Sequence, residues 1–289
     1  MISNSVARSF TIGDARQLCL KRLERGGLGA SAAAETAALI EAVTGLNRSE
    51  QLLRHERAMS DDERAKLADM LHRRLRHEPL QHVTGTAPFY GLDLGVSPAV
   101  LVPRPETERL VELTLAELRG ESGATVLDVG TGSGAIALAI KSERPDLEVW
   151  ACDISAEALS VAIDNAASLG LSVRFRRSDL LSDPEIAEVA ARATAVVANL
   201  PYLPVADAPG LSPEVKHDPP VALFGGEDGL EVARRLRLQA ERVMLPGALL
   251  ALELDERNAD KLAAGMVSWR AVRLESDLLD RQRFVLARL

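Results

Sequence analysis

The segment LDVGTGSGAIALAI, residues 127–140, gives the clearest indication of the fold. It starts as an apolar segment, passes through Gly130, Gly132 and Gly134, and continues with the apolar spacing of a helix. Because glycine has no Cβ, these positions permit a tight turn between strand and helix and let a ligand approach the backbone. Asp153 follows roughly twenty residues later, which is the spacing of a carboxylate that binds ribose hydroxyls. The pattern predicts a nucleotide-type ligand at this turn.

Strand-like and helix-like segments alternate around this turn. Strands are expected at 125–130, 148–153, 172–179, 193–199 and 247–254, with two closing strands of which the last is 281–288. Helices are expected at 107–118, 133–143, 155–170, from about residue 230, and once more before the closing strands. This alternation predicts an α/β fold with a mostly parallel, doubly wound sheet covered by helices on both faces. Such sheets bind ligands at the carboxyl ends of their strands.

Residues 1–79 are rich in Ala, Leu, Glu and Arg with helical spacing. Helices are predicted at 14–27, 31–45 and 60–78. Ser31 is the expected N-cap of the second helix, and Ser60 with Glu63 has the pattern of a capping box at the third. The first helix is expected to bury one apolar face, which consists of Ala15, Leu18, Cys19 and Leu23. The region is therefore predicted to be a small helical domain.

Proline placement separates this helical region from the rest of the chain. Two short windows, 79–105 and 201–220, hold most of the 14 prolines. The segment PFYGLDLGVSPAVLVP, residues 88–103, alternates in places and carries Gly and Pro at turn positions, which predicts a short hairpin. The second window is expected to be a functional loop. The expected organisation is a helical domain at 1–79, a β-hairpin linker at 80–106 and an α/β domain at 107–289.

The composition excludes several classes of protein. With 289 residues, of which 47% are apolar and 26% charged, the chain can bury a large core. Its net charge of −8 argues against a surface that neutralises a phosphate backbone, so nucleic acid is not an expected partner. No leader pattern and no membrane-length apolar run occur, so no membrane association is expected. The two cysteines and five histidines show no metal-ligand spacing, so no metal is expected. The two cysteines also indicate no disulfide framework, which fits a cytoplasmic location.

The residues around the glycine turn leave two cofactors open. A dinucleotide fingerprint has its third glycine one position later, where Ala135 is a tolerated small substitute, so the spacing alone does not exclude NAD. Asp128 favours S-adenosylmethionine, because a carboxylate there would repel a pyrophosphate but could orient a cationic amino group, directly or through water. Asp179 ends the third strand, where it could meet an adenine amino group or cap the following turn.

A second candidate site is the tetrapeptide NLPY, residues 199–202, which begins with the last residue of the strand expected at 193–199. Asn and Pro often do no more than end a strand, because Asn tolerates unusual backbone angles and Pro cannot donate to a sheet ladder. In the order GTGSG, Asp153, SDL and NLPY, however, the motifs resemble those of class I methyltransferases. The segments RPETE at 104–108 and HDPPVALFGGEDGLEVARRL at 217–236 resemble, more specifically, the PrmC (HemK) family of protein glutamine N5-methyltransferases.

This resemblance spans roughly residues 70 to 289. It implies a Rossmann-like, seven-stranded methyltransferase domain preceded by a helical domain and a hairpin linker, which agrees with the organisation predicted above. Asp228 within GGEDGL and Glu231 directly after it have the spacing of the N-cap and N3 residues of a capping box, so we expect structural roles for them.

The resemblance also implies which residues form the site. S-adenosylmethionine is expected to bind at Gly130, Thr131, Gly132, Ser133, Gly134, Asp153, Asp179, Leu180 and Asn199. The expected catalytic and substrate-binding residues are Asn199, Leu200, Pro201 and Tyr202. An amide nitrogen is a poor nucleophile, so its two N–H groups need acceptors that favour the more tetrahedral transition state. The resemblance supplies these acceptors as the Asn199 side-chain oxygen and the Leu200 carbonyl, with Tyr202 packed beside the planar group.

The implied reaction is methylation of the glutamine in the GGQ motif of peptide-chain release factors, with the helical domain helping to grip the protein. One departure leaves alternatives open: the family usually has NPPY, whereas Leu200 gives NLPY, the form found in rRNA adenine dimethyltransferases. An N6-adenine methyltransferase acting on RNA or DNA is one alternative. A glutamine methyltransferase of another protein, such as a ribosomal protein, is a second, and a non-catalytic module that keeps the cofactor fold is a third.

Overall fold

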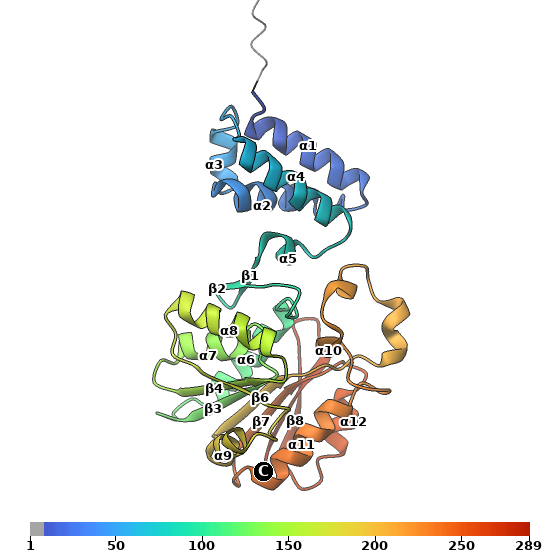
Figure 1. The fold of residues 1–289 in the computed structure, drawn as a ribbon. Coiled ribbons are helices and arrows are strands. Elements are labelled where there is room, and N and C mark those ends of the chain that lie inside the picture. The colour runs from blue at the N-terminus through green and yellow to red at the C-terminus, as the bar shows by residue number, and fades with distance from the viewer. Residues whose placement is uncertain (1–8) are drawn as a thin grey trace, which may run out of the picture. The chain divides into compact units, whose positions relative to one another are not determined.

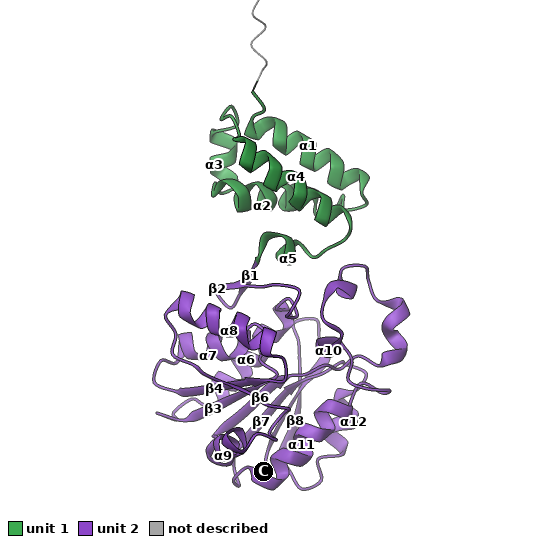
Figure 2. Cartoon of the chain, in the orientation of Figure 1, with its two compact units in different colours: residues 1–85 green, residues 86–289 purple. Residues whose placement is uncertain are grey.

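The computed structural model describes residues 9–289, and the chain forms two compact units, residues 1–85 and 86–289 (Figure 2). Residues 1–8 lie outside the described part. The start of the expected domain 1–79 and the start of the segment searched for a leader pattern fall within these eight residues. The division between the units falls at Gly85 and Thr86, so the predicted hairpin belongs to the second unit. None of the helices within 9–289 combines the length and the apolar character that crossing a membrane requires.

The first unit is built of helices around one apolar core. Its helices are α1 (Ile12–Arg25), α2 (Ala32–Thr44), α3 (Arg48–Leu53), α4 (Asp61–Leu75) and α5 (Leu80–Thr84). The three predicted helices are thus present, and α3 and α5 are short additions to them. The predicted capping box begins α4: the Ser60 side chain accepts a hydrogen bond from the Glu63 backbone N–H, and the Glu63 carboxylate accepts one from the Ser60 N–H.

One detail of the helical prediction is wrong. Leu18 is 41% exposed, because the buried stripe of α1 is narrow and consists of Ile12, Ala15, Cys19 and Leu23. Ser31 is the N-cap residue of α2, as predicted, but its side chain accepts no hydrogen bond from the helix, since its backbone is already helical (φ −106°, ψ −7°). Its hydroxyl instead donates a hydrogen bond to the Glu35 carboxylate at 2.8 Å.

The second unit opens with a hairpin and continues into a seven-stranded sheet. The hairpin pairs β1 (Thr86–Phe89) with β2 (Leu92–Gly95). The sheet strands are β3 (Thr125–Val129), β4 (Glu148–Asp153), β5 (Arg174–Arg177), β6 (Ala195–Asn199), β7 (Leu249–Glu253), β8 (Arg270–Ser276) and β9 (Gln282–Arg288). Their order is β5-β4-β3-β6-β7-β9-β8, and β9 runs antiparallel to both of its neighbours. The prediction of a mostly parallel, doubly wound sheet is confirmed.

Helices cover both faces of this sheet, as Figure 1 shows. One face carries α6 (Pro105–Glu117), α7 (Ala135–Glu143) and α8 (Ala156–Leu169); the other carries α9 (Pro184–Arg192), α11 (Glu231–Val243) and α12 (Ala259–Ala264). Successive residues of one strand point to opposite faces. In β3, Val126 accordingly packs with the first group of helices, whereas Leu127 and Val129 pack with the second.

The strand order reverses between β3 and β6, and a long connection leaves the sheet at that point. It runs from β6 to α11 through the second proline-rich window and contains the 3-10 helices η1 (Val205–Gly210) and η2 (Val215–His217) and the short helix α10 (Pro220–Leu223). The neighbours β3, β4 and β6 are parallel, so their carboxyl ends meet at one edge of the sheet. Ligands of doubly wound sheets bind at such a switch point.

Candidate active site

A cavity opens at the carboxyl ends of β3, β4 and β6. Most of the predicted site residues line it: Gly130, Thr131, Gly132, Ser133, Asp153, Asp179, Leu180, Asn199, Leu200 and Pro201. It is also lined by residues that no motif had assigned to the site, among them Phe89, Thr107, Phe224 and Arg235. Gly134 and Tyr202 are not among the described residues that line it. The glycine loop and the NLPY segment, far apart in sequence, therefore meet at one cavity.

The glycine loop joins β3 to α7 through residues with left-handed backbone angles. Gly130, Gly132 and Gly134 have φ values of 73°, 57° and 85°, which glycine adopts at little cost. The backbone N–H groups of Gly130 and Thr131 both donate to the Cys152 carbonyl in β4, at 2.8 and 3.0 Å. Gly134 lies behind the loop at the start of α7, where a Cβ would crowd the side chains of α7 and α8. The loop is therefore fixed against β4 and α8.

Asp128 in β3 stabilises this loop through hydrogen bonds. The residue is completely buried, and its Oδ2 accepts hydrogen bonds from the Thr131 hydroxyl at 2.6 Å and from the Ala137 backbone N–H at 3.2 Å. Burial raises the pKa of Asp128 to about 7. It is not among the residues that line the cavity. The expectation that Asp128 orients the amino group of the cofactor, directly or through water, stays a prediction.

Asp153, at the end of β4, does face the cavity. Its Oδ2 accepts a hydrogen bond from the Gly132 N–H and its Oδ1 accepts one from the Ser155 N–H, both at 2.9 Å. A carboxylate offers about four acceptor positions, so each oxygen can still accept a hydrogen bond from a diol. Burial raises the pKa of Asp153, and the backbone hydrogen bonds lower it. The carboxylate is thus held beside the glycine loop in an orientation suited to ribose.

The loop after β5 brings Asp179 and Leu180 to the cavity. The Asp179 carboxylate forms a half-exposed ion pair with Arg235 of α11, at 2.6 Å. It does not cap the following helix, because that role belongs to Asp183, whose side chain accepts from two backbone N–H groups of α9. Leu180 is buried and has a φ of 52°, and its carbonyl accepts a hydrogen bond from the Ser178 hydroxyl at 2.7 Å.

Asn199 ends β6 and presents an acceptor to the cavity. Its Nδ2 donates a hydrogen bond to Oγ1 of Thr107 in α6, at 2.9 Å. Within residues 9–289 its Oδ1 accepts no hydrogen bond, so this oxygen is free to bind a donor from a ligand. Thr107 lies in the RPETE segment. This segment supports the family resemblance, but the sequence alone gives no role for Thr107.

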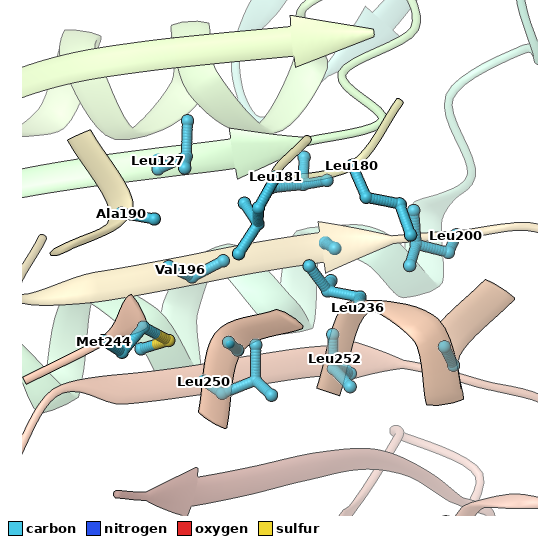
Figure 3. Packing of buried hydrophobic residues seen from close by; sticks show 14 of the residues in the cluster. Leu127, Leu180, Leu181, Ala190, Val196, Leu200, Leu236, Met244, Leu250 and Leu252 are labelled. Carbon is cyan, nitrogen blue, oxygen red and sulfur yellow. The ribbon is translucent and has the colours of Figure 1, made fainter. Parts of the chain in front are cut away.

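Leu200 connects the NLPY motif to the glycine loop. It is 4% exposed and shares a hydrophobic cluster with Leu180 and Leu236 (Figure 3). Its Cδ2 lies 2.9 Å from the point where a Cβ on Gly130 would stand. The side chain that distinguishes NLPY from NPPY therefore fills a position between the sheet core and the cofactor loop.

The rest of the NLPY loop pairs with the segment that ends in GGEDG. The Leu203 N–H donates to the Leu223 carbonyl, and the Gly225 N–H donates to the Leu203 carbonyl, both at 2.9 Å. The Val205 N–H donates to the Gly226 carbonyl at 3.0 Å. These hydrogen bonds hold residues 203–205, which directly follow the NLPY motif, against residues 223–226.

Two glycines allow this close approach. A Cβ on Gly225 would collide with the Pro201 carbonyl oxygen, and one on Gly229 would collide with the Tyr202 carbonyl oxygen. Gly229 also has a φ of 77°. Tyr202 itself is half-buried against the hydrophobic core, and burial raises its pKa to about 12. The GGEDG turn therefore sets the backbone position of Pro201 and Tyr202.

The capping box predicted at Asp228 and Glu231 is wrong. Helix α11 begins at Glu231 itself, and Leu230 occupies the N-cap position without a side-chain cap. The left-handed backbone of Gly229 turns the chain before the helix starts. Asp228 Oδ1 accepts a hydrogen bond from the Leu230 N–H at 3.0 Å, and its carboxylate pairs with Arg234 at 2.6 Å.

Two carboxyl groups near the site were missed in the sequence. Glu253 in β7 is aligned with Asn199 in β6 and is 1% exposed. The signal for it was a single acid in the apolar strand ALLALEL. Asp218, in the HDPP segment, is buried and pairs at 2.6 Å with Arg104, which lines the cavity. This ion pair ties the chain before α6 to the proline-rich loop.

The cavity fits S-adenosylmethionine in two respects. The glycine loop offers backbone without obstruction, since nothing lies within 4 Å of a Cβ placed on Gly132. Asp153 offers acceptors to a ribose diol beside it. A doubly wound sheet with an antiparallel β9 and this cavity at its switch point defines a class I methyltransferase, a class of enzymes that take their methyl group from S-adenosylmethionine.

Comparisons with known proteins agree with this class and narrow it. The family described as "PrmC N-terminal domain" matches residues 14–85, and "Methyltransferase small domain" matches residues 107–204. The solved structure of the hMettl16 catalytic domain superposes with a TM-score of 0.56 at 15% identity, over 79% of this chain and 82% of that one. At that identity the likeness shows the fold alone.

Relatives of nearly full length share a single description. The "Release factor glutamine methyltransferase" of Deinococcus radiodurans is 46% identical over 269 residues, which are 92% of this chain and 94% of the relative. The protein with the same description from Moorella thermoacetica is 38% identical over 96% of this chain and 98% of its own. The chain belongs to the family of release factor glutamine methyltransferases.

Proposed function

We propose that this protein transfers a methyl group from S-adenosylmethionine to the side-chain amide nitrogen of the GGQ glutamine in a peptide-chain release factor. The observation that carries the proposal is the free Oδ1 of Asn199 at a cavity that the glycine loop also lines. The descriptions of the relatives support glutamine as the acceptor and a release factor as its carrier. They do not favour adenine in RNA or DNA.

The proposed cofactor site lies along the ends of β3, β4 and β5. Asp153 binds the ribose hydroxyls, and Asp179 with Leu180 borders the adenine. The remaining contacts come from the glycine loop and the end of β6, namely from Gly130, Thr131, Gly132, Ser133 and Asn199, while Gly134 shapes the loop from behind. When bound, S-adenosylmethionine supplies a methyl group on a positively charged sulfur that needs no further activation.

The proposed acceptor site holds the glutamine NH2 group. Its nitrogen is a weak nucleophile because the lone pair is delocalised into the carbonyl. The Asn199 Oδ1 and the Leu200 carbonyl accept its two N–H groups, and these hydrogen bonds strengthen as the nitrogen becomes tetrahedral. Pro201 restricts Leu200 to an extended conformation. Tyr202 does not line the cavity and packs against the hydrophobic core next to this motif.

Positioning is then the main contribution of the protein. Holding two groups in line can supply a large part of a rate enhancement, and no side chain has to remove a proton before the methyl group moves. Phe89 and Phe224 line the cavity and reduce the access of water to the two reacting groups.

The proposal gives each part of the chain a role. Residues 1–79 grip the release factor, residues 80–106 form the linker, and residues 107–289 carry the reaction. Within the second unit the hairpin is tied to α8, because Asn165 accepts a hydrogen bond from the Gly95 N–H at 2.7 Å and donates one to its carbonyl at 2.9 Å. A cytoplasmic location belongs to the same proposal, since release factors act in translation.

Transfer of labelled methyl tests the proposal. The full chain is incubated with methyl-labelled S-adenosylmethionine and, separately, with unmodified release factor, with a release factor whose GGQ glutamine is replaced by alanine, and with RNA. We expect label in the first acceptor alone. Label in RNA with none in release factor would establish the adenine alternative, and failure to bind S-adenosylmethionine by calorimetry would establish a non-catalytic module.

A further inference from the structure

The side-chain amide of Asn199 can serve the reaction in only one of its two orientations. With Oδ1 toward the cavity it accepts a hydrogen bond from the substrate NH2 group. With Nδ2 toward the cavity, the amide would present a donor to the substrate NH2 group, which is itself a donor, and no hydrogen bond could form. The groups that fix the orientation of this amide are therefore as important for the reaction as Asn199 itself.

Thr107 fixes the orientation through its hydroxyl group. Its Oγ1 receives the hydrogen bond from Asn199 Nδ2 at 2.9 Å. A hydroxyl has one proton to donate and can also accept. As long as that proton is donated elsewhere, Thr107 can only accept from Asn199, and Nδ2 must face it. Thr107 is 4% exposed, so water does not compete for the contact.

Glu253 offers an acceptor for the Thr107 hydroxyl. It is aligned with Asn199 in the sheet, in β7, and its interaction with the Thr107 side chain lowers its pKa. A carboxylate only accepts hydrogen bonds, and a protonated carboxyl group keeps one oxygen that can only accept. With Glu253 as the acceptor of the Thr107 hydroxyl, the donors run in one direction, from Asn199 Nδ2 to Thr107 and from Thr107 to Glu253, which leaves Oδ1 of Asn199 for the cavity.

Packing alone does not explain an acid at position 253. The residue is 1% exposed in an otherwise apolar strand, and among the described residues its Oε2 has no hydrogen-bond partner. Burial raises the pKa of Glu253 to about 7, and the contact with Thr107 and the charge of Arg283 lower it. Arg283 is itself paired with Asp277, at 3.2 Å. An apolar residue of similar size would be easier to accommodate here.

We propose that Thr107 and Glu253 are positioning residues that hold the Asn199 amide with its oxygen toward the substrate nitrogen. This inference rests on the proposed function and adds two residues to its machinery. Neither residue removes a proton or binds the cofactor. Both act on the reaction through Asn199.

A double-mutant cycle tests the inference. Thr107→Val removes the hydroxyl at nearly constant shape, Thr107→Ser keeps it, and Asn199→Ala removes the group on which Thr107 acts. We expect Thr107→Val to lower kcat for release factor methylation by at least about tenfold, because single polar contacts to a transition state carry factors of this size or larger. Thr107→Ser should restore most of the rate, and calorimetry should show unchanged cofactor affinity in both.

The decisive comparison is Thr107→Val in the Asn199→Ala background, where it should cause no further loss. A further loss equal to that in the wild type would overturn the inference, because Thr107 would then act independently of Asn199. Glu253→Met provides a second variant that does not depend on the folding of the first. It should be at least as stable as the wild type in urea and yet lose kcat; unchanged kcat in a folded Glu253→Met protein would also overturn the inference.

The wild-type reaction separates this inference from the proposed function. If the wild-type chain transfers no methyl group to release factor, the proposed function fails and the inference fails with it. If the wild type transfers the methyl group and folded Thr107→Val does so at the same rate, the inference alone is wrong.

Discussion

Leu200 Cδ2 lies 2.9 Å from the point where a Cβ on Gly130 would stand. Leu200 belongs to the proposed acceptor motif, and Gly130 belongs to the loop proposed to hold the cofactor. Glycine at position 130 therefore meets two demands, a left-handed backbone with a φ of 73° and room for a buried leucine. The two halves of the site are packed against each other, so a change in one should be felt in the other.

Gly130→Ala should destabilise the protein more than Gly132→Ala in the same loop. A left-handed alanine costs about 1–2 kcal/mol, and crowding of the buried Leu200 side chain adds about 1–3 kcal/mol. Gly132→Ala is the matched control, since Gly132 has a φ of 57° and nothing within 4 Å of its added Cβ. Urea unfolding measures both variants. Equal losses of unfolding free energy would show that the contact with Leu200 does not matter.

Leu200→Pro, which converts NLPY to NPPY, should alter stability but not substrate choice. The change removes part of a side chain that is 4% exposed, at a cost on the order of 1–2 kcal/mol. The carbonyl proposed to accept the substrate N–H remains. Methylation assays should therefore find release factor as the acceptor for both proteins. A change of acceptor from RNA to release factor on this substitution would show that Leu200 determines the substrate.

Gly225→Ala should lower the rate of methyl transfer while leaving cofactor affinity unchanged. Its Cβ would collide with the Pro201 carbonyl, and backbone cannot move aside as a flexible side chain can. Misplacement of a reacting group by about 1 Å can cost 10²-fold, so we expect a loss of at least about tenfold in kcat. Gly210→Ala in the same long connection is the control, because nothing lies within 4 Å of its Cβ. A folded Gly225→Ala protein with the wild-type kcat contradicts this role of the GGEDG turn.

Asp128 should make stability fall as the pH rises toward neutrality. Burial raises its pKa to about 7, whereas in the unfolded chain it titrates near its usual value of about 4. Between these values the folded state binds more protons, so the free energy of unfolding decreases with rising pH, by at most about 1.4 kcal/mol per pH unit for this group. Asp128→Asn, compared with the wild type in urea at pH 5 and pH 7, should lose this dependence. Parallel pH profiles would contradict the buried, protonated state of Asp128.

Much of the fold could be predicted because its central strands, β3, β6 and β7, are buried on both faces. Such strands appear in the sequence as continuous apolar runs, and β4 was predicted with the bounds that the structure gives it. Helices α3 and α5 were not predicted, because they are short and depend on tertiary contacts. In α3, for example, the Gln51 side chain donates to the Ala37 and Leu46 carbonyls at 2.9 and 2.8 Å.

The site was predictable where local sequence determines it. Gly130 follows β3 and Asp153 ends β4, and parallel strands of one sheet end at the same edge, so their meeting there follows from the fold class. The roles of Thr107 and Glu253 were not predictable, because they depend on how α6 and β7 align with β6. The burial of Asp128 could not be predicted either, because the sequence does not show whether a carboxylate in a strand faces the cavity or the protein interior.

The central claim is that the acceptor is the glutamine amide of the GGQ motif. Tandem mass spectrometry of release factor peptides, after incubation with the full chain and S-adenosylmethionine, locates the methyl group directly. We expect one added methyl group on the GGQ glutamine side chain, and much less of it when Asn199→Ala replaces the wild type at saturating cofactor. An unmethylated GGQ peptide, or a methyl group on any other residue, would contradict it.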